Sequence, residues 1–252
     1  MHTIKKILLG LAFLTITATS VQALEWKASC NSEYSNPSDG TYIFHVKKGE
    51  VGGCPNDSKS GDNGRWKWSE RSEVKSTSIP KGKWEWSAVI DIDRNCKPAY
   101  RTTLFQIHSA RKGTNPPSFI GINEYNKFRT DDGNIHNGKS VWNKPGNVDV
   151  PSDKFKLTAI IHHIQKSVNV DYFVNDKFVV TTKDSNSNPR EPYLKFGMYR
   201  VNSSCDITLT YTDVKVKRVI GKTKDINLKE SRVRPAGCDW PSVRKVLGDQ
   251  CL

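Results

Sequence analysis

Three short segments of the chain place polar side chains at alternate positions, where a β-strand presents them on one face. In the first, residues 70–74 (ERSEV), Arg71 and Glu73 share that face. An arginine held by a carboxylate is often an ordinary surface salt bridge, and the pair alone favours this interpretation. The same arrangement also presents a rigid guanidinium group to a substrate carboxylate. Without other evidence, the pair favours the structural salt bridge.

The second segment, residues 104–108 (LFQIH), places Gln106 and His108 on one face and Phe105 and Ile107 on the other. A single histidine is more often a surface or core residue than a catalyst. Here, however, the amide of Gln106 lies beside a group that titrates near neutral pH. This combination favours a functional face.

The third segment, residues 193–200 (YLKFGMYR), alternates Tyr193, Lys195 and Tyr199 with apolar residues. Its polar face carries an ammonium group and a phenol on either side of Gly197. Because a glycine within a strand often marks the close approach of a ligand, this spacing suits a flat ligand such as a sugar ring over Gly197. The alternative is a strand with ordinary outward polar residues.

The elements that must position these side chains are strands, because alternation and β-branched runs dominate the sequence and few segments indicate helix. Asn175-Asp176 is typical of a tight hairpin turn, and Trp84 and Trp86 open a long alternating strand, so we expect both in the core. Many short strands predict an all-β sandwich or jelly roll. The predicted strands are residues 40–47, 82–92, 100–108, 118–124, 154–164, 167–174, 177–182, 193–199 and 206–219, and the predicted loops are 56–64, 113–117, 131–146 and 184–192.

The N-terminus has the pattern of an export signal. Lys5 and Lys6 precede an apolar run from Ile7 to about Val21, and small residues end near Ala23. We therefore predict a signal peptide at residues 1–23, a β domain at 24–220 and a basic C-terminal extension at 221–252. The predicted location is secreted or periplasmic, and the leader does not distinguish the two.

Six cysteines form an even set in a chain predicted to be exported, which favours up to three disulfides over a metal site. Fifteen pairings are possible; we predict only Cys238 with Cys251, because both lie in the tail. Asp91, Asp93 and Asp213 could bind a structural calcium ion, although surface aspartates without an ion are the commoner case.

The formal net charge of +13 falls by two when Lys5 and Lys6 leave with the leader, so the mature chain stays basic. Nucleic acid, an anionic membrane and an acidic polysaccharide all fit such a charge, as does a basic surface that serves only solubility. Export favours the polysaccharide, so we predict an acidic polysaccharide as the partner, with neither nucleic acid nor membrane. The sequence does not indicate the oligomeric state.

Taken together, the three segments resemble motifs of the jelly-roll polysaccharide lyases, which include alginate lyases, glucuronan lyases and the heparin lyase I type. RSEV (71–74) is similar to their Arg-Thr/Ser-Glu-Leu/Val strand, QIH (106–108) to their Gln-Ile/Val-His strand, and YLKFGMYR (193–200) to their Tyr-Phe-Lys-x-Gly-x-Tyr strand. The motifs follow the family order. The resemblance covers about residues 24–220 and implies a concanavalin-like jelly roll of two antiparallel sheets.

One departure concerns the substrate. The third motif continues Tyr199-Arg200-Val201, where alginate lyases typically have Tyr-Asn-Gln. Phe196 and Arg200 are closer to the heparin and glucuronan lyase branch, so the uronate polymer stays open.

The resemblance implies β-elimination from a 4-linked uronate, without a required cofactor. Arg71 and Gln106 would hydrogen-bond the substrate carboxylate. Tyr199 would act as base, acid or both, with His108 as base or partner. A phenol ordinarily ionises near pH ~10, so base duty requires cations close to it. The implied catalytic residues are Arg71, Gln106, His108 and Tyr199, and the implied substrate-binding residues are Lys195, Glu73, Tyr193 and Arg200.

Two alternatives belong to other classes. Glycoside hydrolysis needs two opposed carboxyl groups, and the sequence has no Glu-x-Asp-x-x-Glu run of the kind that hydrolases of similar architecture use. The runner-up is a non-catalytic lectin that holds an acidic glycan on the same basic, aromatic face.

Overall fold

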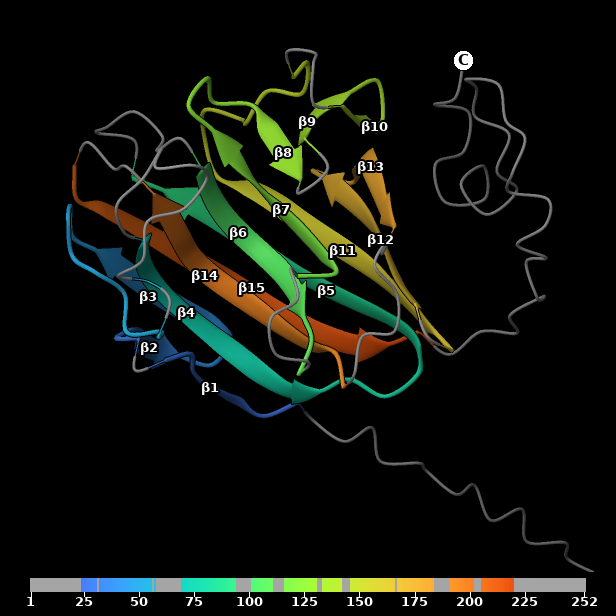
Figure 1. The fold of residues 1–252 in the computed structure, drawn as a ribbon, viewed down its shortest axis with the longest axis horizontal. Helices are drawn as coiled ribbons and strands as arrows, with labels where there is room; N and C mark the ends of the chain where they lie inside the picture. Colours follow the sequence, from blue (N-terminus) through green and yellow to red (C-terminus); the bar gives the residue numbers. More distant parts are fainter. Residues whose placement is uncertain are drawn as a thin grey trace, which may run out of the picture.

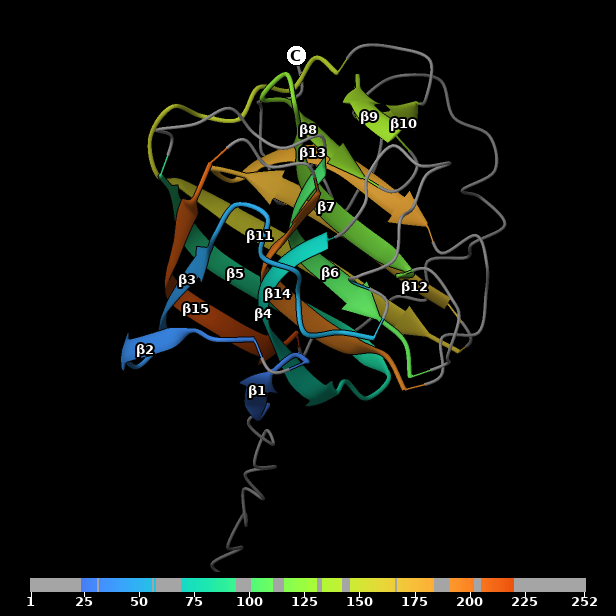
Figure 2. The same cartoon turned by 60° about the vertical axis from the view of Figure 1, so that its left-hand side comes forward.

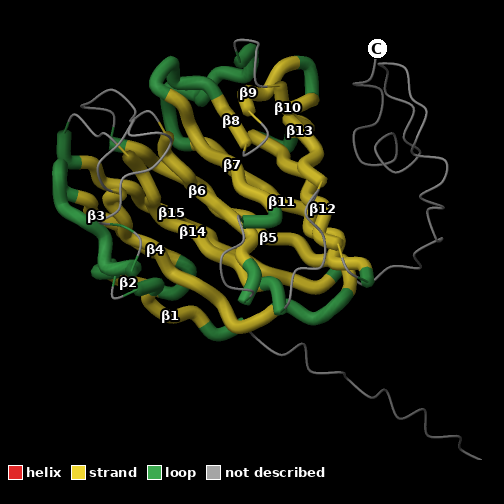
Figure 3. The backbone as a smooth tube through the Cα atoms, viewed as in Figure 1, coloured by secondary structure: helices red, strands yellow, loops and turns green. Residues whose placement is uncertain are grey.

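The computed structural model describes residues 24–30, 32–55, 57, 69–93, 101–110, 116–130, 133–141, 146–165, 167–183, 191–201 and 205–219. These residues form only strands and loops (Figure 3), and none of their segments is a helix long and apolar enough to cross a membrane. The strands are β1 (Trp26–Ala28), β2 (Ser35–Ser38), β3 (Thr41–Val46), β4 (Ser69–Ser78), β5 (Gly82–Ile92), β6 (Arg101–His108), β7 (Ser118–Asn123), β8 (Phe128–Thr130), β9 (Gly133–His136), β10 (Lys139–Val141), β11 (Phe155–Ile164), β12 (Ser167–Val174), β13 (Lys177–Lys183), β14 (Tyr193–Val201) and β15 (Ile207–Arg218).

The strands make two sheets that pack face to face (Figures 1 and 2). The eight-stranded sheet has the order β1-β4-β14-β6-β7-β8-β9-β10, and the seven-stranded sheet has the order β13-β12-β11-β5-β15-β3-β2. Neighbouring strands pair antiparallel throughout, from β1 with β4 to β12 with β13. The predicted all-β jelly-roll sandwich of two antiparallel sheets is confirmed.

The core lies between the sheets, because each strand turns its apolar alternate residues inward. Trp86 of β5 stacks on Phe105 of β6 with ring centres 4.3 Å apart, which joins the two layers. Trp84 and Trp86 are 4% and 0% exposed, as expected for core residues. Truncation of a tryptophan in such a core costs about 3–5 kcal/mol.

The nine predicted strands correspond to β3, β5, β6, β7, β11, β12, β13, β14 and β15, with ends within two residues of those observed. The turn at Asn175-Asp176 is also confirmed, since both residues have positive φ, 48° and 62°. The loop predicted at 131–146 is wrong in part: it contains β9 and β10, joined by a turn in which Asn137 and Gly138 have φ of 49° and 71°. Strands of three or four residues are too short to show a period.

Cys30, just after β1, forms a disulfide with Cys54, in the loop after β3. Cys205 is disulfide-bonded as well. The predicted pair Cys238–Cys251, the signal peptide at 1–23 and the extension at 221–252 lie outside the described residues, so these stay predictions.

Candidate active site

The three polar segments meet on adjacent strands of the eight-stranded sheet, where β14 lies between β4 and β6. The register places Glu73 of β4 opposite Gly197 of β14, and Lys195 of β14 opposite Gln106 of β6. The alternate residues Leu194, Phe196 and Met198 are fully buried in the core. The polar residues therefore share the sheet face that points away from the core, as the alternation predicts.

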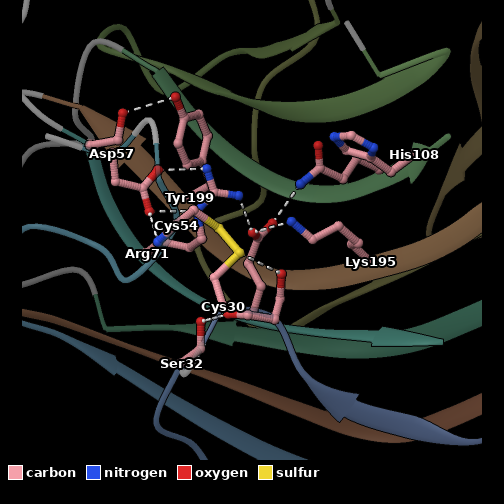
Figure 4. Close-up of polar contacts among 12 residues, drawn as sticks. Cys30, Ser32, Cys54, Asp57, Arg71, His108, Lys195 and Tyr199 are labelled. Atoms are coloured by element: carbon pink, nitrogen blue, oxygen red, sulfur yellow. Dashed lines mark hydrogen bonds and ion pairs between the residues drawn. A yellow bond between two sulfur atoms is a disulfide. The ribbon is translucent and has the colours of Figure 1, made fainter. Parts of the chain in front are cut away.

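Glu73 is the residue that ties the three strands together. Its Oε2 accepts hydrogen bonds from Arg71 Nη1 and Lys195 Nζ, both at 2.7 Å, and its Oε1 accepts one from Gln106 Nε2 at 2.6 Å. Figure 4 shows Arg71 and Lys195 with their side chains pointing toward one another. Burial alone would raise the pKa of Glu73, but Lys195 and Arg71 hold it at about 2. Glu73 is therefore ionised at neutral pH.

Asp57 binds the other edge of the Arg71 guanidinium group. Arg71 Nε donates to Asp57 Oδ2 at 3.1 Å and Nη2 donates to Oδ1 at 2.8 Å, a bidentate pair. The Cys54 N–H also donates to Asp57 Oδ2 at 3.0 Å. Burial would lower the pKa of Arg71, but Glu73 and Asp57 together raise it. Arg71 is thus a fixed cation between two buried carboxylates.

Gly52 allows the Asp57 loop to approach β4. A Cβ atom on Gly52 would overlap Asp57 Oδ2 and lie 2.9 Å from the Cβ of Arg71. The backbone of Gly52 also donates to Ser69 O at 2.8 Å, and Ser69 N donates to Asp57 O at 2.7 Å. The loop that the Cys30–Cys54 disulfide holds is therefore packed directly on the stem of Arg71.

Two cations and two carboxylates make this inner network electrically neutral, but some of its N–H groups donate to no atom within it. Within the described part of the chain, Arg71 uses three of its five N–H groups, Lys195 one of three and Gln106 one of two. Lys195 and Gln106 are 3% and 5% exposed, and the Arg71 side chain is 14% exposed. Arg71 is thus the member of the network that a ligand reaches first.

Tyr199 lies at one end of the network. It pairs with Arg71 across β4 and β14, and the Arg71 guanidinium carbon is 4.3 Å from the centre of its ring. The Tyr199 hydroxyl shares a hydrogen bond of 3.0 Å with Ser69 Oγ. Tyr199 is half-buried, so part of its side chain stays accessible next to the Arg71 guanidinium group.

His108 lies on the other side, away from Tyr199 (Figure 4). Its ring stacks on Tyr193 with centres 5.3 Å apart, and Nδ1 is 3.0 Å from Ser109 O. The Ser109 N–H also lies 3.0 Å from Nδ1, so Nδ1 either accepts from this amide or donates to the carbonyl. In the tautomer in which Nδ1–H donates to the carbonyl, Nε2 carries the lone pair. Burial lowers the pKa of His108, with Lys195 and Arg71 adding to this effect against the opposing Ser109 and Glu73. The imidazole is therefore neutral at pH 7 and able to accept a proton.

Two of the predicted substrate-binding residues, Arg200 and Glu73, are buried and contact other protein groups. Arg200 is next to Tyr199 in β14, so its side chain points to the opposite, inner face. It is 1% exposed, with Nε 2.7 Å from Glu70 Oε2 and Nη2 2.8 Å from Val46 O. Glu73 is 1% exposed and accepts three hydrogen bonds. Arg200 therefore stabilises the interior of the protein. Glu73 orients the three side chains that donate hydrogen bonds to it.

The need for a glycine at position 197 has a structural cause that the sequence did not indicate. The φ of Gly197 is +127°, and a Cβ atom there would overlap Ser72 O and lie 2.8 Å from the Cα of Glu73. The neighbouring strand β4, which places Glu73, therefore requires a glycine at this position whether or not a ligand lies over it.

The candidate calcium ligands are not gathered. Asp91 pairs with Lys154 at 3.2 Å and Asp213 lies 3.7 Å from Lys215. In the part of the chain that the structure describes, no three histidine, cysteine or acidic side chains are grouped as metal ligands would be.

No family model matches the sequence, and no curated protein matches it. Among solved structures, the chain is similar to alginate lyase A1-II′, a member of polysaccharide lyase family 7, at 12% identity over 73% of this chain and 82% of that one, with a TM-score of 0.47. The alginate lyase AlyA1 from Zobellia galactanivorans gives 12% identity, 76% and 82% coverage and a TM-score of 0.47. The binding domain of a botulinum neurotoxin gives 15% identity, 80% and 45% coverage and a TM-score of 0.42. At these values, the chemistry of the site rests on its own contacts.

Proposed function

We propose that this protein is an exported polysaccharide lyase that cleaves a uronate-containing acidic polysaccharide by β-elimination. The observation that carries the proposal is the fixed guanidinium of Arg71, flanked by a phenol and by a neutral imidazole. The order of the three motifs supports it as well. The basic net charge, formally +13 for the whole sequence and two lower without the leader, suits a polyanionic substrate.

The first requirement of the reaction is to stabilise charge at the uronate carboxylate. The C5 proton is weakly acidic until hydrogen bonds and positive charge stabilise the enolate-like anion that its loss creates. The N–H groups of Arg71 and Gln106 that do not contact Glu73 or Asp57 donate hydrogen bonds to the uronate carboxylate. Lys195 holds the carboxylate of Glu73 in place between Arg71 and Gln106. Because Asp57 and Glu73 fix these donors beforehand, little reorganisation is needed during the reaction.

The second requirement is a base and an acid. We assign the base to His108, whose Nε2 takes the C5 proton, and the acid to Tyr199, whose hydroxyl protonates the leaving O4. The electrons of the C5–H bond form the C4–C5 double bond as the C4–O4 bond breaks. The step balances without added water, metal or cofactor.

The test is ultraviolet absorbance of unsaturated uronate products, measured with alginate, glucuronan, hyaluronan and heparin-type polymers. We expect absorbance to rise with at least one polymer. Tyr199→Phe should abolish the rise and retain polymer binding, whereas Tyr125→Phe, at an exposed tyrosine in the β7–β8 turn, should behave as the parent. Full activity of Tyr199→Phe would remove Tyr199 from the mechanism. Retention on a polymer without any absorbance change would favour the lectin.

A further inference from the structure

Arg101, the first residue of β6, lies on the same sheet face as the candidate site. It pairs with Val201 of β14 and with Asn123 of β7. Its guanidinium carbon is 4.6 Å from the centre of the Phe119 ring. Phe119 pairs with Gln106, whereas the adjacent Ile120 belongs to the core between the sheets. Arg101 therefore runs along the polar face toward Gln106.

No carboxylate neutralises Arg101 within the part of the chain that the structure describes. Arg71 and Lys195 are both paired with buried carboxylates, but the Arg101 guanidinium packs on the aromatic ring of Phe119. Its Nε is buried without a hydrogen-bond partner among the described residues. A buried donor without a partner costs about 1–3 kcal/mol, so it calls for an acceptor.

The position of Arg101 suits a sugar next to the one that reacts. Directly opposed residues on adjacent strands have Cβ atoms about 5 Å apart, so the guanidinium lies within roughly 10 Å of Gln106. Between them the sheet carries Thr103 and Gly121, which are small and pair with each other. Nothing bulky on these two residues separates Arg101 from the catalytic cluster.

We propose that Arg101, stacked on Phe119, binds the carboxylate of a neighbouring uronate in the polymer, and thereby selects chains that carry acidic groups on more than one sugar. A guanidinium fork matches a carboxylate, and the flat face of Phe119 holds the fork in one plane. This inference rests on the proposed function and adds a second acidic position to the substrate.

The test is binding of purified uronate oligosaccharides by calorimetry, in a Tyr199→Phe background so that no turnover occurs. Arg101→Met keeps the apolar stem and removes the charge. We expect the affinity to fall about tenfold or more, as for a lost charged hydrogen bond, and to depend less steeply on salt. Arg101→Lys should restore only part of the affinity, because lysine lacks the fork. Arg218→Met, at an exposed arginine of β15 in the other sheet, is the matched control and should bind as the background does.

The outcomes separate this inference from the proposed function. An unchanged affinity in a folded Arg101→Met variant, or an equal loss in Arg218→Met, overturns the role of Arg101. Weaker binding by Arg101→Met, in a protein whose parent binds but releases no unsaturated product, supports Arg101 and rejects the lyase. A parent that binds no uronate polymer overturns both.

Discussion

Arg71 and Glu73 show what alternate spacing reveals at the scale of single residues. The spacing placed both on one strand face, and the structure pairs them at 2.7 Å. The second carboxylate, Asp57, was not foreseen, because it lies in a segment predicted as loop and contacts Arg71 through the fold. Asp57 lies three residues after Cys54, but the pairing of Cys54 was not predictable, so the sequence held no signal for the contact with Arg71.

Arg200 is buried in the interior, away from the polar face on which the sequence predicted it to bind substrate. The resemblance matched it as part of a motif, but adjacent residues of a strand face opposite ways, and Tyr199 is the one on the polar face. Applying the alternation strictly would have placed Arg200 with Phe196 and Met198 in the interior.

We predict that Glu73→Gln destabilises the protein strongly, because it leaves Lys195 buried without a counter-charge. The free energy of unfolding should fall by roughly 3–5 kcal/mol at pH 7. Glu85→Gln removes a pair with Lys217 in which the lysine is exposed and the glutamate half-buried, and it should change the free energy of unfolding by less than about 1 kcal/mol. Denaturant unfolding of both variants measures this, and equal losses would contradict the role of Glu73.

The pH dependence of stability follows from the same residue. The pKa of Glu73 in the folded protein, about 2, lies below its ordinary value of 4.5, so the stabilisation is complete above pH 4.5 and is lost as the pH falls toward 2. We expect the free energy of unfolding of the parent to fall between pH 4.5 and pH 2. In Glu73→Gln, the part of this fall that comes from protonation of Glu73 should be absent.

The pH dependence of activity depends on His108. Because burial lowers its pKa, the neutral base persists below the ordinary histidine value of about 6.5. The acidic limb of the kcat/KM profile should therefore lie below that pH. His108→Asn should remove most of the activity together with this limb; an acidic limb that persists unchanged in an active His108→Asn variant would assign the base elsewhere.

At the scale of elements, the strands with several alternating residues were predictable because each buries one face against the opposite sheet. The short strands β1, β2, β8, β9 and β10 were not, since they are held by pairing with their neighbours more than by a pattern of their own. The irregular register of β14 was not predictable either. It shifts between Phe196 and Tyr199 relative to β6, and this shift depends on three strands meeting.

Gly197→Ala should damage this arrangement. The added methyl group meets backbone atoms of β4, which cannot turn aside as a flexible side chain could. We expect a loss of several kcal/mol in stability together with loss of activity. Gly49→Ala is the control: it too has positive φ, +75°, but its Cβ would meet nothing within 4 Å, so it should cost only about 1 kcal/mol. Equal thermal shifts for the two would mean that the backbone conformation, and not the contact with β4, sets the requirement for glycine.

At the scale of the whole molecule, the sandwich followed from the strand content, whereas the disulfide pairing did not. Six cysteines allow fifteen pairings, and only the fold brings Cys30 and Cys54, 24 residues apart, into contact. That contact links the edge strand β1 to the loop that carries Asp57, so it joins stability to the site.

Replacing Cys30 and Cys54 by serine should therefore have two effects. Stability should fall by about 3 kcal/mol through the larger freedom of the unfolded chain. In addition, kcat should fall under conditions where the variant is still folded, because Asp57 no longer fixes Arg71. Asp57→Asn should reproduce the loss of kcat with a smaller loss of stability. A folded double-serine variant with the kcat of the parent would limit the disulfide to a role in stability.

The most direct test of the central claim is to digest a responsive uronate polymer in heavy-oxygen water and weigh the products by mass spectrometry. Elimination adds no water, so a brief digestion, stopped before reducing ends exchange oxygen with the solvent, should yield products without the heavy label. One of the two new ends at each cut should carry a double bond. Products that gain one labelled oxygen per cut, with no unsaturated ends, would show hydrolysis and contradict the account.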